Sequence, residues 1–238
     1  MLARMSEHEY APNLDRVLAE IEAGGNYTAW IVDRARPYLR GRVLDAGAGT
    51  GTFTEVVARV ADEVVALEPD SRFAELLSKR FANDARVRVA HSELEDLGSN
   101  LGEFDAIVCF NVLEHVRDDE RALRALHDRL RPGGVLLLLV PAHPALAAPF
   151  DRAVGHVRRY SRRNLARSLR AAGFAVDTLR HVNPIGAIGW AVRMRLLRQR
   201  EWPSTSFRVF DRIVPLLRPL DALHLPFGLS VWAVARRP

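Results

Sequence analysis

Short apolar runs alternate with helix-like segments over residues 42–140. The apolar runs are Arg42–Ala46, Glu63–Glu68, Val87–Ala90, Phe104–Phe110 and Val135–Val140. They are continuous stretches of Val, Leu and Ile, a pattern typical of strands that are buried on both faces of a parallel sheet. Apolar residues at helical spacing occupy three segments between them: Thr52–Val60, Ser71–Phe81 and Asp118–Leu130. The alternation predicts a doubly wound, Rossmann-like α/β sheet.

Further elements flank this core. Two helices are predicted ahead of the first strand, at Leu14–Ile21 and Tyr27–Leu39. After the core we expect a helix at Ser161–Ala172, a sixth strand at Phe174–His181 and a seventh strand at Gly228–Arg236. The chain is therefore expected to be one domain: N-terminal helices (1–40), a core (41–181), an insert (182–227) and a last strand (228–238).

The insert between the sixth and seventh strands is far longer than the connection that a hairpin needs. It contains two helix-like pieces, Gly186–Gln199 and Phe207–Leu223, in which apolar residues alternate with arginines. One interpretation is a surface cap that completes the core. The other is a substrate lid that admits a large or lipid-like acceptor, with its arginines facing phosphates of a membrane or a phosphorylated carrier.

Charge is distributed unevenly along the chain. The formal net charge of the 238 residues is +5. Residues 1–150 carry 17 basic and 24 acidic side chains, whereas residues 151–238 carry 17 arginines and 5 acids. A basic late segment suggests an anionic partner: a phosphorylated substrate, a membrane surface or nucleic acid.

Cysteine content and hydropathy narrow the class of protein. Cys109 is the single cysteine, so no internal disulfide forms, and no Cys/His spacing predicts a metal site. No apolar run is long enough to span a membrane. The sequence therefore predicts a cytoplasmic protein and leaves a peripheral membrane contact open.

A glycine-rich turn follows the first strand. The segment Val43–Gly51 ends the strand in Asp45 and then places glycines at 47, 49 and 51. A dinucleotide fingerprint has its third glycine three positions after the second, and that position here is Thr52. A carboxylate at Asp45 would repel a pyrophosphate but suits a cofactor that carries an ammonium group. These features disfavour a nicotinamide-dependent oxidoreductase.

Four motifs in order resemble the class I S-adenosylmethionine-dependent methyltransferases. They are Val43–Gly51, Ala66–Asp70, Phe104–Val108 followed by Asn111–Val116, and Leu130–Leu136. The resemblance implies S-adenosyl-L-methionine as the cofactor. It also implies a seven-stranded, mostly parallel sheet with an antiparallel last strand.

The same resemblance implies a set of cofactor contacts. Gly47, Ala48 and Gly49 would line the methionine part, with Asn111 beside it and Asp45 near its ammonium group. Glu68, followed by Pro69, would hold the ribose. Glu93 would face the adenine amino group and the Leu94 N–H the ring, with Glu95 as the alternative. A second interpretation makes Glu93, Glu95 and Asp96 a solvated acidic loop.

Catalytic candidates lie in the loops after the fourth and fifth strands, where ligands bind in such sheets. They are His115, His143 and His156. Arg159 and Tyr160 are candidate substrate contacts. Alternatively, Asp151, Arg159 and Tyr160 form a structural brace. Tyr10, Tyr27 and Trp30 are candidates to close over the cofactor, although Tyr27 and Trp30 also fit a helix core.

The sequence favours an enzyme that methylates oxygen or nitrogen of a small molecule, including hydrophobic, lipid-linked or phosphorylated ones. An RNA methyltransferase that uses the basic final third is the alternative. However, Asn111–Glu114 lacks the Pro-Pro-aromatic pattern of base-amino methyltransferases. A non-catalytic cofactor-binding protein is less consistent with the intact glycine turn. The acceptor, its reacting atom and the oligomeric state are left open.

Overall fold

A computed structural model describes residues 14–196 and 204–238 and contains one seven-stranded sheet of order β3-β2-β1-β4-β5-β7-β6. Strand β7 is antiparallel to both of its neighbours, and the other pairs are parallel. The predicted fold class is confirmed. The strands are β1 (Arg42–Ala46), β2 (Glu63–Glu68), β3 (Val87–His91), β4 (Phe104–Phe110), β5 (Leu130–Pro141), β6 (Ala175–Val182) and β7 (Ser230–Arg236).

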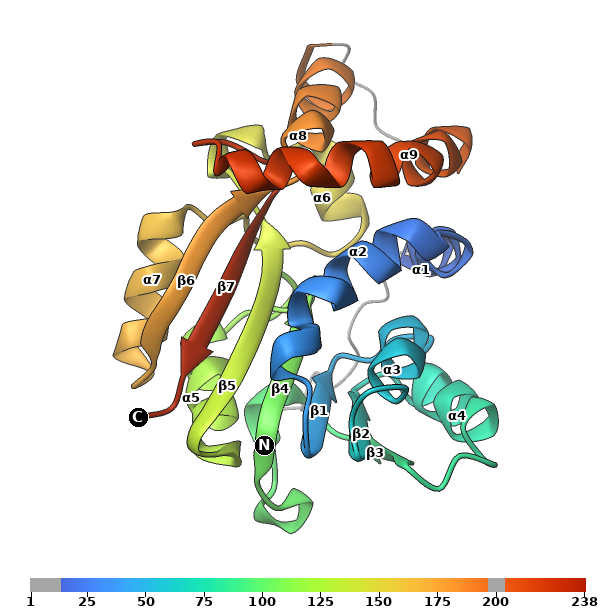
Figure 1. Ribbon diagram of the computed structural model, residues 1–238, viewed down its shortest axis with the longest axis vertical. Coiled ribbons are helices and arrows are strands. Elements are labelled where there is room, and N and C mark those ends of the chain that lie inside the picture. The colour runs from blue at the N-terminus through green and yellow to red at the C-terminus, as the bar shows by residue number, and fades with distance from the viewer. Residues whose placement is uncertain (1–13, 197–203) are drawn as a thin grey trace, which may run out of the picture.

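Helices cover both faces of the sheet (Figure 1). Residues alternate between the two faces, so Leu136 and Leu138 of β5 enter one core while Leu137 and Leu139 enter the other. The first core includes α5 (Asp119–Arg129) and α7 (Arg162–Ala171). The opposite face carries α2 (Gly25–Ala35), α3 (Thr52–Val57), α4 (Ser71–Arg80) and α9 (Ser204–Leu217). The remaining helices are α1 (Leu14–Ala23), α6 (Pro149–Ala153) and α8 (Pro184–Trp190).

Most predicted elements agree with the structure to within a few residues. The second N-terminal helix begins at Gly25 and ends at Ala35, followed by a 3₁₀ turn at Arg36–Tyr38, because Pro37 has no N–H for helical pairing. The first insert helix is α8, continued by a π-helix at Ala191–Leu196. Its predicted end at Gln199, like Tyr10, lies outside the described residues.

The described parts of the insert, 182–196 and 204–227, form a cap over the carboxyl ends of the central strands, with α9 lying across them beside α2 (Figure 1). Helix α2 has Gly24 as its N-cap, which offers no capping side chain. The missing acceptor comes from the cap. Buried Asp211 of α9 accepts the Tyr27 N–H at 2.8 Å and the Asn26 side-chain amide at 3.2 Å. Asp211 therefore caps α2 from another helix and joins the cap to the core.

Replacing Asp211 by Ala should destabilise the fold by about 1–2 kcal/mol, since a helix terminus loses its capping carboxylate. Urea denaturation measures the free energy of unfolding. The matched control is Asp177→Ala, which removes a half-exposed ion pair with Arg236 and should cost no more than about 0.5 kcal/mol. Equal losses in the two variants would contradict the capping role.

Candidate active site

The glycine turn at the end of β1 has a backbone that side chains cannot adopt without strain. Gly47, Gly49 and Gly51 have φ angles of 82°, 55° and 89°. A Cβ on Gly47 would lie 2.5 Å from Val112, and one on Gly51 would lie 2.7 Å from Phe81. The turn thus brings its backbone close to its neighbours, as a cofactor loop requires.

Glu68, at the end of β2, holds this turn. Its carboxylate accepts the Gly49 N–H at 2.8 Å and the Asp70 N–H at 3.0 Å. Burial raises the pKa of Glu68, and the two N–H donors oppose that rise. Pro69 follows, and its carbonyl contacts His91 at 2.9 Å. The ribose role of Glu68 and the role of Pro69 stay predictions.

Asp45 is buried at the end of β1. It accepts the Thr54 hydroxyl at 2.6 Å. Burial raises the pKa of Asp45 to about 6, partly offset by that hydrogen bond. An acid with this pKa gains from a cationic neighbour, which is the contact that the cofactor ammonium would supply.

The predicted adenine side lies after β3. Leu94 is buried at the start of a 3₁₀ turn, Leu94–Asp96, and Glu93 precedes it in an extended conformation. Asp96 pairs with Arg121 of α5, which favours a structural role for Asp96. The assignments of Glu93, Leu94 and the alternative Glu95 stay predictions.

Three strands are followed, within two residues, by a non-glycine residue with a positive φ angle. These residues are Asn111 after β4, His143 after β5 and Asn183 after β6, with φ angles of 55°, 57° and 60°. Such strain concentrates at functional sites. The Asn111 N–H also donates a hydrogen bond to the Leu139 carbonyl at 2.8 Å. The Asn111 side-chain amide donates a hydrogen bond to the hydroxyl of half-buried Tyr27 in α2. Burial raises the pKa of Tyr27 to about 12, and this hydrogen bond opposes the rise.

A titratable cluster follows Asn111. Glu114 is fully buried, and neither carboxylate oxygen has a hydrogen-bond partner among the described residues. His156 Nε2 lies 3.8 Å from Glu114 Oε1, and the His115 and His156 rings meet edge-on at 4.8 Å. Burial raises the pKa of Glu114 to about 7, against the opposing effect of His156. The structure therefore brings two of the three predicted histidines together with an acid.

Asp151 orients His156. Asp151 Oδ1 lies 3.0 Å from His156 Nδ1 and 2.8 Å from Arg159 Nη2. Burial opposes ionisation of Asp151, but these partners outweigh it and hold the pKa of Asp151 below its ordinary value. His156 Nε2 is thereby directed away from Asp151 toward Glu114.

Arg159 and Tyr160 are both buried and make internal contacts. Besides Asp151, Arg159 lies over the Trp190 ring of α8 at 4.3 Å and thus connects the loop to the cap. Tyr160 donates its hydroxyl to Asp119 at 2.8 Å. These contacts favour the bracing interpretation, and substrate binding by the two residues stays a prediction.

His143 is separate from this cluster. Its ring stacks on His181 of β6, with centroids 4.6 Å apart. Burial and nearby Arg159 and Arg162 lower the pKa of His143. Burial, His143 and Arg162 lower the pKa of His181 to about 4, so both rings are neutral at pH 7. A catalytic role for His143 stays a prediction.

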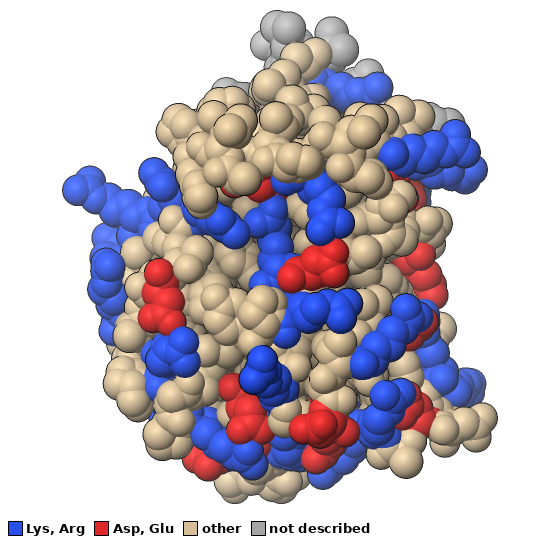
Figure 2. All heavy atoms as spheres, in the orientation of Figure 1, with Lys and Arg blue, Asp and Glu red and all other residues tan. Residues whose placement is uncertain are grey.

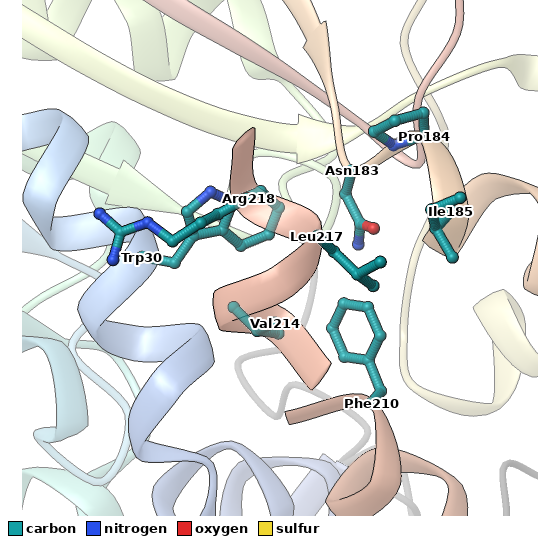
Figure 3. Close-up of a pocket in the computed structure, with 8 residues that line it drawn as sticks. All are labelled: Trp30, Asn183, Pro184, Ile185, Phe210, Val214, Leu217 and Arg218. Atoms are coloured by element: carbon teal, nitrogen blue, oxygen red, sulfur yellow. The ribbon is translucent and has the colours of Figure 1, made fainter. Parts of the chain in front are cut away.

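Two narrow hollows lie beneath the cap. The first is enclosed by α8, α9 and α2 (Figure 3), and its lining includes Trp30, Phe210 and Asn183. The second shares Trp30 and Asn183 and is also lined by Tyr27 and Leu139. Tyr27 and Leu139 both contact Asn111, so this second hollow lies next to the end of β4, but Glu114, His115 and His156 are not part of its lining.

Sequence reasoning missed three residues of this region as site candidates. Glu114 lies inside the Asn111–Val116 motif, but the sequence prediction assigned it no role. The pattern that could have identified it is an acid next to a histidine directly after a buried strand. His181 looked like an ordinary strand end. Asp211 was one acid in a basic helix, and only the fold shows that it caps α2.

Comparison with known proteins decides the family. A family model described as "Methyltransferase domain" matches residues 2–179. The chain belongs to the methyltransferase family. Its fold is that of the class I, S-adenosylmethionine-dependent members of this family.

Relatives agree with this assignment. A "Probable S-adenosylmethionine-dependent methyltransferase" of Mycolicibacterium smegmatis is 32% identical over 58% of this chain and 53% of its own length. A "Ubiquinone biosynthesis O-methyltransferase" of Xanthomonas campestris is 36% identical over 44% of this chain and 45% of its own length. The chain thus spans about half the length of these relatives. The N-methyltransferase NodS of Bradyrhizobium japonicum, solved with S-adenosyl-l-homocysteine, shares the fold (TM-score 0.58, 15% identity, 95% and 99% coverage).

Several of the late arginines pair with acids of the same chain. Arg158 pairs with Asp119, Arg218 with Asp33 and Arg236 with Asp177. Figure 2 shows basic and acidic side chains intermixed over the lower part of one face. The basic final third therefore partly neutralises the acidic first part. In the described residues, no helix is long and apolar enough to cross a membrane.

The affinity of the methyltransferase for S-adenosylhomocysteine should fall as the pH drops below about 6. Below that pH Asp45 is protonated in the free protein, and the proton must leave before the ammonium group can pair with the carboxylate. The affinity should therefore fall by up to about tenfold for each further pH unit. Calorimetry from pH 5 to 8 measures this dependence. Asp45→Asn should bind weakly with a flat profile, whereas the exposed control Glu75→Gln should follow the wild type. A wild-type profile as flat as that of Asp45→Asn would contradict the assignment.

Proposed function

We propose that this methyltransferase methylates a hydroxyl group of a small molecule with an apolar body. The observation that carries the proposal is the pairing of Glu114 and His156 after β4, where Asp151 holds His156 Nδ1 and the Nε2 atom lies 3.8 Å from Glu114 Oε1. An amine acceptor needs mainly positioning, whereas a hydroxyl must also lose its proton. His156 and Glu114 are groups that can take up such a proton, and they follow Asn111, the residue that the sequence predicts beside the methionine part of the cofactor.

The proposed step is an in-line displacement. The acceptor oxygen attacks the methyl carbon, the carbon–sulfur bond breaks, and its electron pair stays on sulfur. The hydroxyl proton leaves to His156 Nε2, the nitrogen that Asp151 leaves unoccupied. The sulfonium supplies the electrophile. Asp151 keeps the imidazole oriented and stabilises its charged form.

The character of the hollows supports an apolar acceptor body. Trp30, Phe210 and Val214 line the first hollow, and Trp30 and Leu139 line the second. Each hollow has one arginine in its lining, and both arginines are already paired, Arg218 with Asp33 and Arg34 with Asp221. Both hollows are narrow, so in this proposal the described parts of the cap, 182–196 and 204–227, move away from α2 to admit the acceptor. A lid role follows for the cap, in line with the single-domain organisation proposed from the sequence. The O-methyltransferase name of one relative agrees with an oxygen acceptor.

His156→Asn should lower kcat on a hydroxyl acceptor by roughly 10²–10⁴-fold, the usual contribution of a general base. The affinity for S-adenosylhomocysteine should not change, because His156 is assigned no cofactor contact. A panel of phenols, catechols and matched aryl amines, followed by S-adenosylhomocysteine release, measures turnover.

The matched control is His127→Asn, a histidine on α5 that packs edge-on against Phe174. It should retain wild-type turnover. Faster methylation of the amines, or an unchanged rate on hydroxyls in His156→Asn, would overturn the proposal.

A further inference from the structure

The cluster at the end of β4 has an electrostatic problem that the described residues do not solve. Glu114 has no exposed surface, and both of its carboxylate oxygens lack hydrogen-bond partners there. A buried, unpartnered carboxylate is costly unless a proton or a cation accompanies it.

The neighbouring imidazole makes the problem sharper. With its Nδ1–H donated to Asp151, neutral His156 turns its Nε2 lone pair toward Glu114 Oε1, 3.8 Å away. Two electron-rich atoms then face one another in a buried site. A positive species between them would remove this repulsion.

A third donor completes the group. Glu114, His115 and His156 each offer one ligand atom, and these atoms all lie within 4.8 Å of one another. Donors around a zinc ion stand about 3–3.5 Å apart, since metal–ligand bonds are about 2.0–2.2 Å long. Small side-chain rotations would therefore bring the three atoms to one ion.

We propose that Glu114, His115 and His156 bind a divalent transition-metal cation, with zinc as the best fit. Two imidazoles and one carboxylate favour zinc or a similar metal over magnesium or calcium, which prefer oxygen ligands. The bond from Asp151 to His156 Nδ1 is the carboxylate–histidine arrangement that orients metal ligands. Linear spacing predicted no metal site, because the loop that carries His156 is distant from Glu114 along the chain.

Three protein ligands leave a coordination position open, as in catalytic zinc sites. In this respect the inference deepens the proposed function: an acceptor hydroxyl bound there would lose its proton to solvent more readily. Because one nitrogen cannot hold both a cation and a proton, His156 Nε2 would accept the hydroxyl proton only in the zinc-free protein, and the cation would activate the acceptor in the zinc-bound protein. Zinc binding itself is independent of any acceptor.

The test uses the full chain, stripped with a chelator and titrated with Zn²⁺ in competition with a chromophoric indicator, without cofactor or acceptor. We expect about one equivalent to bind. Glu114→Gln and His156→Asn should lower the affinity by more than about 100-fold, beyond the roughly 10–100-fold effect of losing an outer-shell partner. The control His127→Asn should bind like the wild type. Thermal denaturation checks that each variant is folded.

Substitution by Co²⁺ provides a second readout, since imidazole–carboxylate coordination gives visible absorption bands that both ligand variants should lose. If the wild type binds no zinc, the cluster is a protonated acid–histidine pair and the proposal fails. Binding that survives in both variants also overturns it. A failure of the proposed function is distinguishable, because it would appear as absent hydroxyl methylation while zinc binding persists.

Discussion

The burial of β4 and β5 on both faces is the constraint on which the rest of the structure depends. Their alternating side chains fill two separate cores, and their backbone groups pair with β1, β7 and one another. No polar side chain can be placed along such strands without a large desolvation cost. Chemistry is therefore confined to the strand ends, where the chain leaves the sheet.

At those ends the polypeptide changes direction abruptly, through residues with positive φ angles. Asn111 and His143 adopt backbone angles that β-strands never use. The turn after β4 returns Glu114 into the protein beneath the Asp151–Tyr160 loop, whose Val157 N–H bonds the Glu114 carbonyl at 2.9 Å. That backbone bond positions His156 against Glu114. Main-chain geometry thus brings the two loops together, and the Asp151 side chain then fixes the orientation of the His156 ring.

The part of this architecture that is local in sequence could be predicted. Continuous apolar runs indicated the buried strands, and glycine spacing together with Asp45 indicated the cofactor class. Contacts between distant segments could not be predicted, because nothing in the pattern around Asp211 shows that α2 lacks a cap. The same holds for Glu114 and His156, whose proximity depends on how two loops cross. Sequence reasoning named His156 for its polar neighbours but not for its acidic partner.

The uneven charge of the chain also has a different meaning in three dimensions. Along the sequence, a basic final third suggested an anionic partner. In the fold, Arg158 pairs with Asp119, Arg218 with Asp33 and Arg159 with Asp151. Two of these pairs join the late segment to the acidic first part. The exposed pair between Arg218 and Asp33 contributes little stability, but buried Arg159 compensates a carboxylate that would otherwise be unpaired. Arg159 balances the negative charge of Asp151, and Asp151 contacts only the Nδ1 atom of His156. The Nε2 atom of His156 therefore stays near Glu114. Arg159 is therefore the arginine of the last third that supports the Glu114–His156 cluster from within, and in the proposed function the acceptor is recognised mainly by apolar contact under the cap.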